Sequence, residues 1–189
     1  MKKLLSFIAV VVILVSCDKA DVTAVIKEPY KLDVEEMVSF IGRPYDSIQS
    51  RFAATNVIVV EKEGNKKVTL AVLDRESPNP NFICEITEHK GIISKIVFST
   101  TMGTHGTFKN TFHYFDQLLS AKYPLSKFYA IDPDGGVNTR SKTKEELYSY
   151  LVYNASSGAA LEFKTSTTKI LNFVNFGNTH PLISVICTQ

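Results

Sequence analysis

Three residues in one stretch carry side chains that could bind a metal ion or transfer a proton: His105, His113 and Asp116. Imidazole and carboxylate groups are common zinc ligands and general acid–base catalysts. Gly106 follows His105 directly and predicts that the helix begins after it, so His105 would lie away from the other two. His113 and Asp116, three residues apart, would then pair on the helix surface. The sequence favours this surface ion pair and leaves a metal or acid–base site as the alternative.

Asp132, Asp134 and Asn138 form a second group of oxygen-bearing side chains, around the segment Asp132-Pro133-Asp134-Gly135-Gly136. Carboxylate and amide oxygens are the ligands that Ca²⁺ prefers, and the two glycines would let a loop bend around an ion. No further ligand in register and no closing Glu completes an EF-hand pattern. Pro, Asp and Gly are also the usual turn formers. We therefore expect a turn here, and no metal or other cofactor.

A third candidate is Cys17, which ends the segment Leu14-Val15-Ser16-Cys17. This segment resembles the lipobox of bacterial lipoproteins, in which an aliphatic residue and small residues precede an obligatory cysteine. The resemblance implies that the Cys17 thiol accepts a diacylglycerol, that a peptidase cleaves in front of it, and that the new amino group takes another acyl chain. Two or more chains anchor stably, because each buried CH₂ contributes about 0.8 kcal/mol.

The residues before Cys17 have the pattern of a signal peptide. Lys2 and Lys3 give a positive start, and the twelve residues Leu4–Val15 form an unbroken apolar run. As a helix this run is about 18 Å long, which is too short for a hydrocarbon core of about 30 Å. We therefore expect residues 1–16 to be a lipoprotein signal peptide and not a permanent membrane span.

The expected mature chain begins with a lipidated tether over residues 17–31. Asp18 and Asp21 resemble the acidic sorting marks found after the lipidated cysteine in such proteins. These marks leave a periplasmic and a cell-surface position both open. The expectation is a lipoprotein anchored in a bacterial envelope, with the outer membrane favoured.

Composition sets limits on the class of partner. The chain has 189 residues and a formal net charge of +2, with 44% hydrophobic and 21% charged residues. Without Lys2 and Lys3, nineteen basic residues balance nineteen acidic ones. This is ordinary globular composition, and it lacks the basic face that a nucleic-acid-binding protein needs. We therefore expect no nucleic-acid partner.

Cys84 and Cys187 each lie on the apolar face of an alternating segment. They could form one disulfide in an oxidising compartment, or they could be two buried thiols that never meet. A chain of this length can build a hydrophobic core without a stabilising disulfide bond, which favours two unbonded thiols.

The first part of the mature chain reads as a pair of helices followed by hairpins. Asp33 can cap a helix that ends at Gly42, and Pro44 suits the first turn of a second helix. Alternating segments with turn residues between them then predict two hairpins. The expected helices cover 34–41 and 44–52, and the expected strands cover 57–61, 67–74, 82–87 and 92–100.

The second part reads as one helix and another set of strands. Thr107 can cap the helix, Tyr123-Pro124 stops it, and residues 124–143 look like a long polar connection. Thr143 and Glu146 could instead start a helix in the segment that we expect to be the first strand. The expected strands cover 146–154, 159–165, 169–176 and 182–188.

These elements predict an α+β fold in which helices pack on one side of an antiparallel sheet. Residues 32–103 would form a helix pair plus four-stranded meander, and residues 104–189 a helix plus four-stranded meander, as two repeats of one unit or one continuous domain. Phe40-Ile41-Gly42-Arg43-Pro44, with Ile48 and Phe52, resembles the helix pair of the β-lactamase-inhibitor-protein and BamE-like unit. The resemblance implies that architecture, and no functional residue is carried over from it.

The sequence has a lipid-anchoring segment and shows no coherent set of catalytic residues. It therefore predicts a non-enzymatic, lipid-anchored envelope protein that binds an envelope protein or a glycan polymer. One alternative is an envelope hydrolase or metal-dependent enzyme that uses His105, His113 and Asp116. Another is a carrier of glycans or small molecules.

Overall fold

The computed structural model describes residues 29–31, 33–62, 65–154, 156–176 and 182–189. The expected signal peptide and Cys17 lie outside the described residues. Within the described ranges, no helix combines the length and apolar character needed to cross a membrane.

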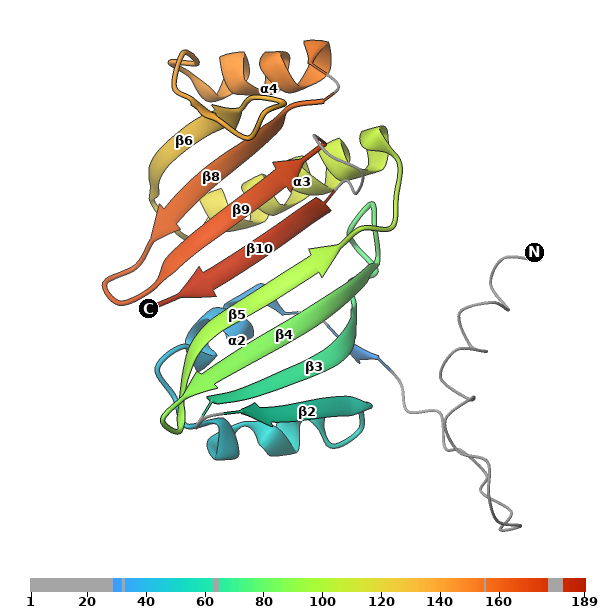
Figure 1. Ribbon diagram of the computed structural model, residues 1–189, viewed down its shortest axis with the longest axis vertical. Helices are drawn as coiled ribbons and strands as arrows, with labels where there is room; N and C mark the ends of the chain where they lie inside the picture. Colours follow the sequence, from blue (N-terminus) through green and yellow to red (C-terminus); the bar gives the residue numbers. More distant parts are fainter. Residues whose placement is uncertain (1–28, 32, 63–64, 155, 177–181) are drawn as a thin grey trace, which may run out of the picture.

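A single ten-stranded sheet forms the centre of the described chain (Figure 1). Its strands are β1 (Tyr30–Lys31), β2 (Val57–Lys62), β3 (Asn65–Leu73), β4 (Asn81–His89), β5 (Ile92–Thr100), β6 (Leu125–Ile131), β7 (Val137–Asn138), β8 (Gly158–Lys164), β9 (Lys169–Asn175) and β10 (Leu182–Thr188). They follow the order β1-β3-β4-β5-β10-β9-β8-β6-β7, and β2 also pairs with β3. Every pair is antiparallel except β1 with β3. The predicted α+β class with a mostly antiparallel sheet is therefore confirmed.

The helices are α2 (Val34–Phe40), α3 (His105–Ser120) and α4 (Lys144–Tyr153), together with 3₁₀ segments η1 (Tyr45–Ser47) and η2 (Gln49–Phe52). Figure 1 shows α2 and α3 behind the sheet and α4 beside β6. The Asn172 amide on β9 donates a hydrogen bond of 2.9 Å to the Phe112 carbonyl oxygen, which fixes α3 to the sheet. Lys144 and Tyr148 of α4 donate hydrogen bonds to Asp116 of α3, so α4 lies on the same side of the sheet as α3.

The core lies between the sheet and these helices. On β4, Phe82, Cys84 and Ile86 are buried while Ile83 between them is exposed, as period-two alternation requires. The register continues this face across the sheet, since Cys84 lies opposite Phe98 of β5 and Phe98 opposite Val185 of β10. The helices add buried aromatic rings to it: Phe108, Phe112 and Phe115 from α3, and Phe40 from α2.

Helix α2 has the predicted boundaries within one residue. The Asp33 carboxylate accepts hydrogen bonds from the backbone N–H groups of Glu35 and Glu36, so Asp33 is the predicted N-cap. Gly42 has φ 85°, the left-handed conformation that glycine adopts without steric cost. The Gly42 position after the helix is therefore confirmed.

The predicted second helix over 44–52 is instead η1 and η2. Backbone bonds link residues three apart, from Ser47 N–H to the Pro44 oxygen and from Ile48 N–H to the Tyr45 oxygen. Such tighter turns suit short pieces. Tyr45, Ile48 and Phe52 are buried, as their spacing predicted.

Helix α3 begins earlier than predicted. Its N-cap is Thr104, whose hydroxyl oxygen accepts a hydrogen bond of 3.2 Å from the Thr107 N–H. The prediction that His105 lies outside the helix is therefore wrong, since His105 is its first residue. Gly106 is tolerated in the first turn of α3, although a helical glycine costs about 0.5–1 kcal/mol relative to alanine.

Two predictions in the second half are wrong. The connection expected over 124–143 contains β6, which pairs with β8, and β7, which pairs with the end of β6. The strand expected over 146–154 is helix α4, so the capping alternative is correct. Its N-cap Thr143 accepts a hydrogen bond from the Glu146 N–H, and the Glu146 carboxylate accepts one from the Lys142 N–H.

The structure does not confirm a repeated unit. The first half runs from α2 through η1 and η2 to the consecutive strands β2–β5, whereas the second half inserts α4 between β7 and β8. Strand β5 pairs with β10, so one sheet crosses the boundary expected near residue 104.

Candidate functional site

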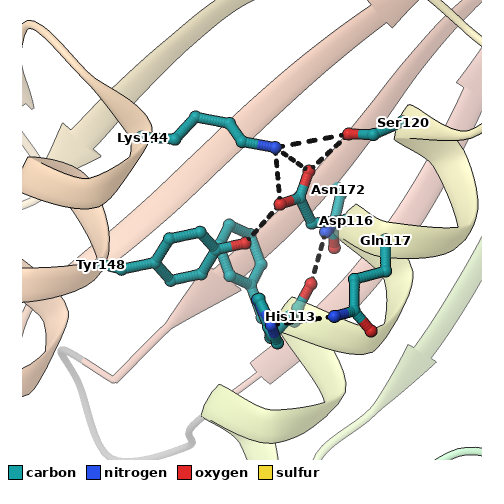
Figure 2. Close-up of polar contacts among 8 residues, drawn as sticks. His113, Asp116, Gln117, Ser120, Lys144, Tyr148 and Asn172 are labelled. Atoms are coloured by element: carbon teal, nitrogen blue, oxygen red, sulfur yellow. Dashed lines mark hydrogen bonds and ion pairs between the residues drawn. The ribbon is translucent and has the colours of Figure 1, made fainter.

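Asp116, one of the three predicted site residues, lies on α3 where α4 packs against it, and it is 3% exposed. Figure 2 shows its carboxylate surrounded by side chains from both helices. The Lys144 ammonium donates to both oxygens at 2.7 Å, and the Ser120 hydroxyl donates to one of them at 2.8 Å. The Tyr148 hydroxyl donates to the other at 2.7 Å. We call these four residues the Asp116 cluster.

The electrostatics of the Asp116 cluster favour a fixed ion pair over proton transfer. Burial raises the pKa of Tyr148, and the hydrogen bond to the Asp116 carboxylate and its charge raise it further. Tyr148 therefore keeps its proton at neutral pH and serves as a donor. With Lys144 charged, the Asp116 oxygens already accept hydrogen bonds from three side chains, so this carboxylate is poorly placed to bind a metal ion or to act as a base.

His113 contacts the edge of this cluster and not its carboxylate. Its Nε2 lies 3.2 Å from the Gln117 side-chain nitrogen, and its ring meets the Tyr148 ring edge-on with centroids 5.1 Å apart. The predicted surface pair of His113 with Asp116 is therefore replaced by a pair with Lys144, which α4 brings to the carboxylate.

His105 is separated from both other candidates. His113 follows His105 by eight positions, which is about 12 Å along a helix. The His105 ring packs on Phe176 with centroids 3.9 Å apart, and its buried Nε2 has no hydrogen-bond partner among the described residues. Burial, aided by the charge of Lys109, lowers the pKa of His105. The described residues hold no group of three or more His, Cys, Asp or Glu side chains placed to share a metal ion.

The second candidate group forms a turn, as predicted. The Asp132 carboxylate accepts hydrogen bonds from the Asn138 amide at 2.9 Å and from the Tyr150 hydroxyl at 2.5 Å. The hydrogen bond from Asn138 lowers the pKa of Asp132 most, and the hydrogen bond from Tyr150 lowers it further. The Asp134 carboxylate accepts from the Gly136 N–H at 2.9 Å, and Gly135 takes φ 88°. Asp132, Asp134 and Asn138 thus stabilise the β6–β7 connection and tie it to α4.

The two described cysteines are buried and unbonded, which confirms the favoured prediction. Cys84 on β4 and Cys187 on β10 lie on either side of β5. Two strand spacings alone put about 9.6 Å between β4 and β10, and Cys187 lies two residues beyond the position in line with Cys84, so the pair exceeds the roughly 7 Å that a disulfide can bridge. Burial raises the pKa of Cys187 to about 12, and that of Cys84 is raised by burial first and then by Cys187.

We expect Cys84 and Cys187 to resist alkylation in the folded chain and to react fully in urea, because the thiolate is the nucleophile. Iodoacetamide labelling followed by peptide mass spectrometry measures this. Rapid labelling of either cysteine without denaturant would contradict the packing of β4, β5 and β10.

The structure also contains a cleft that the sequence did not predict. It measures about 610 Å³, and five carboxylate and two cationic side chains line it, so we call it the acidic cleft. Its lining residues are Tyr30, Lys31, Asp33, Val34, Glu35, Glu36, Asp74, Arg75, Glu76, Tyr114 and Leu118. The acidic residues come from the first turn of α2 and from the loop after β3, so only tertiary contact brings them together.

Most polar groups in this cleft already have partners. Glu36 accepts from the Tyr30 hydroxyl and pairs with Arg51. Burial and a hydrogen bond to Asp74 raise the pKa of Tyr114. Because these two phenols stay protonated and donate to Glu36 and Asp74, the cleft offers a ligand aromatic rings and the remaining acceptor oxygens.

Comparison with known proteins gives this chain no relative: no family model, no curated protein and no solved structure matches it.

Proposed function

We propose that the chain is a lipid-anchored protein of a bacterial cell envelope that acts by binding and not by catalysis. The lipobox-like segment ending at Cys17 carries the proposal, because a cysteine after an aliphatic residue and a serine, behind a short apolar run, is what acylation requires. The membrane is then one partner, through the N-terminal lipid, and an envelope protein or glycan is the other.

The geometry of the candidate residues of the enzymatic alternative supports the non-enzymatic half of the proposal. Asp116 is taken up by Lys144, Tyr148 and Ser120, while His105 packs on Phe176 at a distance from it. These contacts hold α4 and the end of the sheet in place. A hydrolase or metal-dependent enzyme built on His105, His113 and Asp116 gains no support from this arrangement.

The acidic cleft favours one second candidate, a carrier of glycans or small molecules. Concave sites with a few polar groups beside aromatic rings are typical of such ligands. Tyr30 and Tyr114 supply the rings, and Asp74 and Glu76 supply acceptor oxygens for sugar hydroxyls. The helix-pair resemblance noted in the sequence remains a proposal about architecture only.

The anchoring proposal is tested on the full-length chain expressed in a Gram-negative host. We expect the wild-type chain to begin at an acylated Cys17 and to incorporate a labelled fatty acid. The Cys17→Ala variant should keep its leader and take up no label, since the nucleophilic sulfur is gone. Intact-mass spectrometry and fatty-acid labelling measure both.

Asp18→Asn is the matched control, because it changes the neighbouring residue and leaves the sulfur. It should be processed and labelled like the wild-type chain. A wild-type N-terminus that is intact, or trimmed beyond Cys17 with no acyl mass, would refute anchoring.

A further inference from the structure

Strand β2 leaves one edge of the sheet unpaired among the described residues. It pairs with β3 on one side, and no other described strand runs along its outer side. Ile58, Val59 and Val60 are 66%, 49% and 57% exposed. Successive residues of a strand point to opposite faces, so this edge is apolar on both faces. The charged residues of β2, Glu61 and Lys62, lie at its C-terminal end, and its apolar part contains no proline and no register shift against β3. Such an exposed apolar edge readily pairs with another strand.

The opposite edge of the sheet is protected against such pairing. Strand β7 covers Ala130 and Ile131 of β6, and a register shift between Leu125 and Lys127 breaks the regular ladder. The charged side chain of Lys127 is exposed there. Because β2 finds no complementary edge at the far side of a second copy, an open-ended chain of copies is disfavoured. Pairing of β2 with β2 about a two-fold axis is the closed arrangement.

We propose that two copies of this chain pair antiparallel through β2, centred on Val59, so that the sheet continues from one copy into the other. The register follows from the hairpin. Lys62 and Asn65 are partners across a two-residue connection, and such a flanking pair is hydrogen-bonded. Hydrogen-bonded and non-hydrogen-bonded pairs alternate along the ladder, so the backbone N–H and C=O groups of Val57, Val59 and Glu61 point away from β3. When the pair is centred on Val59, each of these N–H groups faces a C=O group of the second copy, and each C=O group faces an N–H group.

The side chains identify a second copy as the occupant. In this register Ile58 of one copy lies opposite Val60 of the other on one face, and the two Val59 side chains meet on the other face. Aliphatic residues therefore meet aliphatic residues throughout the centre of the pair. Glu61 lies at the end of the pair, where its carboxylate forms an ion pair at 3.7 Å with Lys66 of its own copy.

A single strand pair buries well below the roughly 1,200 Å² of stable interfaces, so the dimer is expected to be reversible. Confinement of a lipidated chain to a membrane would raise its effective concentration and favour pairing. The dimer itself does not depend on anchoring, because β2 carries it in any compartment.

The test is cysteine cross-linking of the full-length chain in the cells that express it. With Val59→Cys, two new thiols face each other across the two-fold axis, at a Cα separation of about 5.5 Å that a disulfide can bridge. Mild oxidation should yield a species of twice the chain mass, well above the background of the wild-type chain. Adding Val60→Lys, which inserts an ammonium into the aliphatic pair, should lower the cross-linked fraction about tenfold, the effect of a loss near 1.4 kcal/mol.

Val152→Cys is the matched control, because Val152 is an aliphatic residue of α4 that is 53% exposed and lies on another surface. It should give no cross-link above the wild-type background. Three results would each overturn the proposal: no doubled species from Val59→Cys, equal cross-linking from Val152→Cys, or an adduct whose mass is not twice that of the chain. The third would mean that a different protein occupies the edge.

Discussion

The Asp116→Ala variant is expected to unfold with a free energy about 3 kcal/mol below that of the wild-type chain. The substitution removes the acceptor for the Lys144 ammonium and the Tyr148 hydroxyl, which then lie unpaired between α3 and α4. Breaking a buried ion pair on one side costs about 3–5 kcal/mol. The lower end of that range applies, because the Lys144 side chain is 28% exposed and part of its charge can turn to water. Urea unfolding followed by circular dichroism measures the loss.

Two further variants show whether the loss comes from the cluster. Tyr148→Phe removes one hydrogen bond and should cost about 1 kcal/mol. Gln117→Ala changes the exposed neighbour of Asp116 and should stay within about 0.5 kcal/mol of the wild-type value. If Asp116→Ala cost no more than Gln117→Ala, the cluster would not stabilise the fold. Asp116 would then regain interest as a reactive carboxylate.

A loss of this size favours a structural role for the Asp116 carboxylate over a role in binding or catalysis. A functional carboxylate is usually left with open acceptor positions toward a cavity, whereas each oxygen of Asp116 already accepts from the Lys144 ammonium and from one hydroxyl. The same reasoning applies to Asp132, whose oxygen is occupied by Asn138 and Tyr150. Acidic residues on α3 and on the β6–β7 connection thus attach α4 at two points.

Local patterns predicted the elements that local forces decide. The capping side chain of Asp33, the left-handed Gly42 and the alternation in β4 and β5 depend on neighbours within a few residues, and all three are confirmed. Strand β6 was missed because Ser126 and Lys127 interrupt its apolar pattern. Its pairing with β8, whose residues lie 27 to 38 positions further along the chain, makes it a strand. Such long-range pairing leaves no local signal.

The same limit explains the candidate site. Asp116 was singled out by residue type, but its partners Lys144 and Tyr148 lie 28 and 32 residues away. One signal could have found them: if Thr143 and Glu146 start a helix, then Lys144 and Tyr148 fall four residues apart on one face. Tyr148 and Tyr150, which fall in the expected strand over 146–154, would then have been placed on α4. The acidic cleft gave no such signal, because its carboxylates come from two separate segments.

Gly158→Ala is expected to lower the free energy of unfolding by about 3 kcal/mol, although it adds one methyl group. Gly158 opens β8 and lies opposite Asn175 of β9. A Cβ atom there would lie 2.4 Å from the Val174 carbonyl oxygen and 3.1 Å from the Asn175 Cα. Both are backbone atoms of a paired strand, so relief requires β8 and β9 to move apart.

Gly106→Ala is the matched comparison and should change stability in the opposite direction. A Cβ atom at Gly106 would have only the Thr104 hydroxyl oxygen near it, at 3.9 Å, and the residue lies in the first turn of α3. Replacing a helical glycine by alanine gains about 0.5–1 kcal/mol, chiefly by restricting the unfolded chain. Thermal and urea unfolding of both variants measure the difference. Equal stability of the two would mean that β8 does not approach β9 as closely as the register from Gly158 to Lys164 requires.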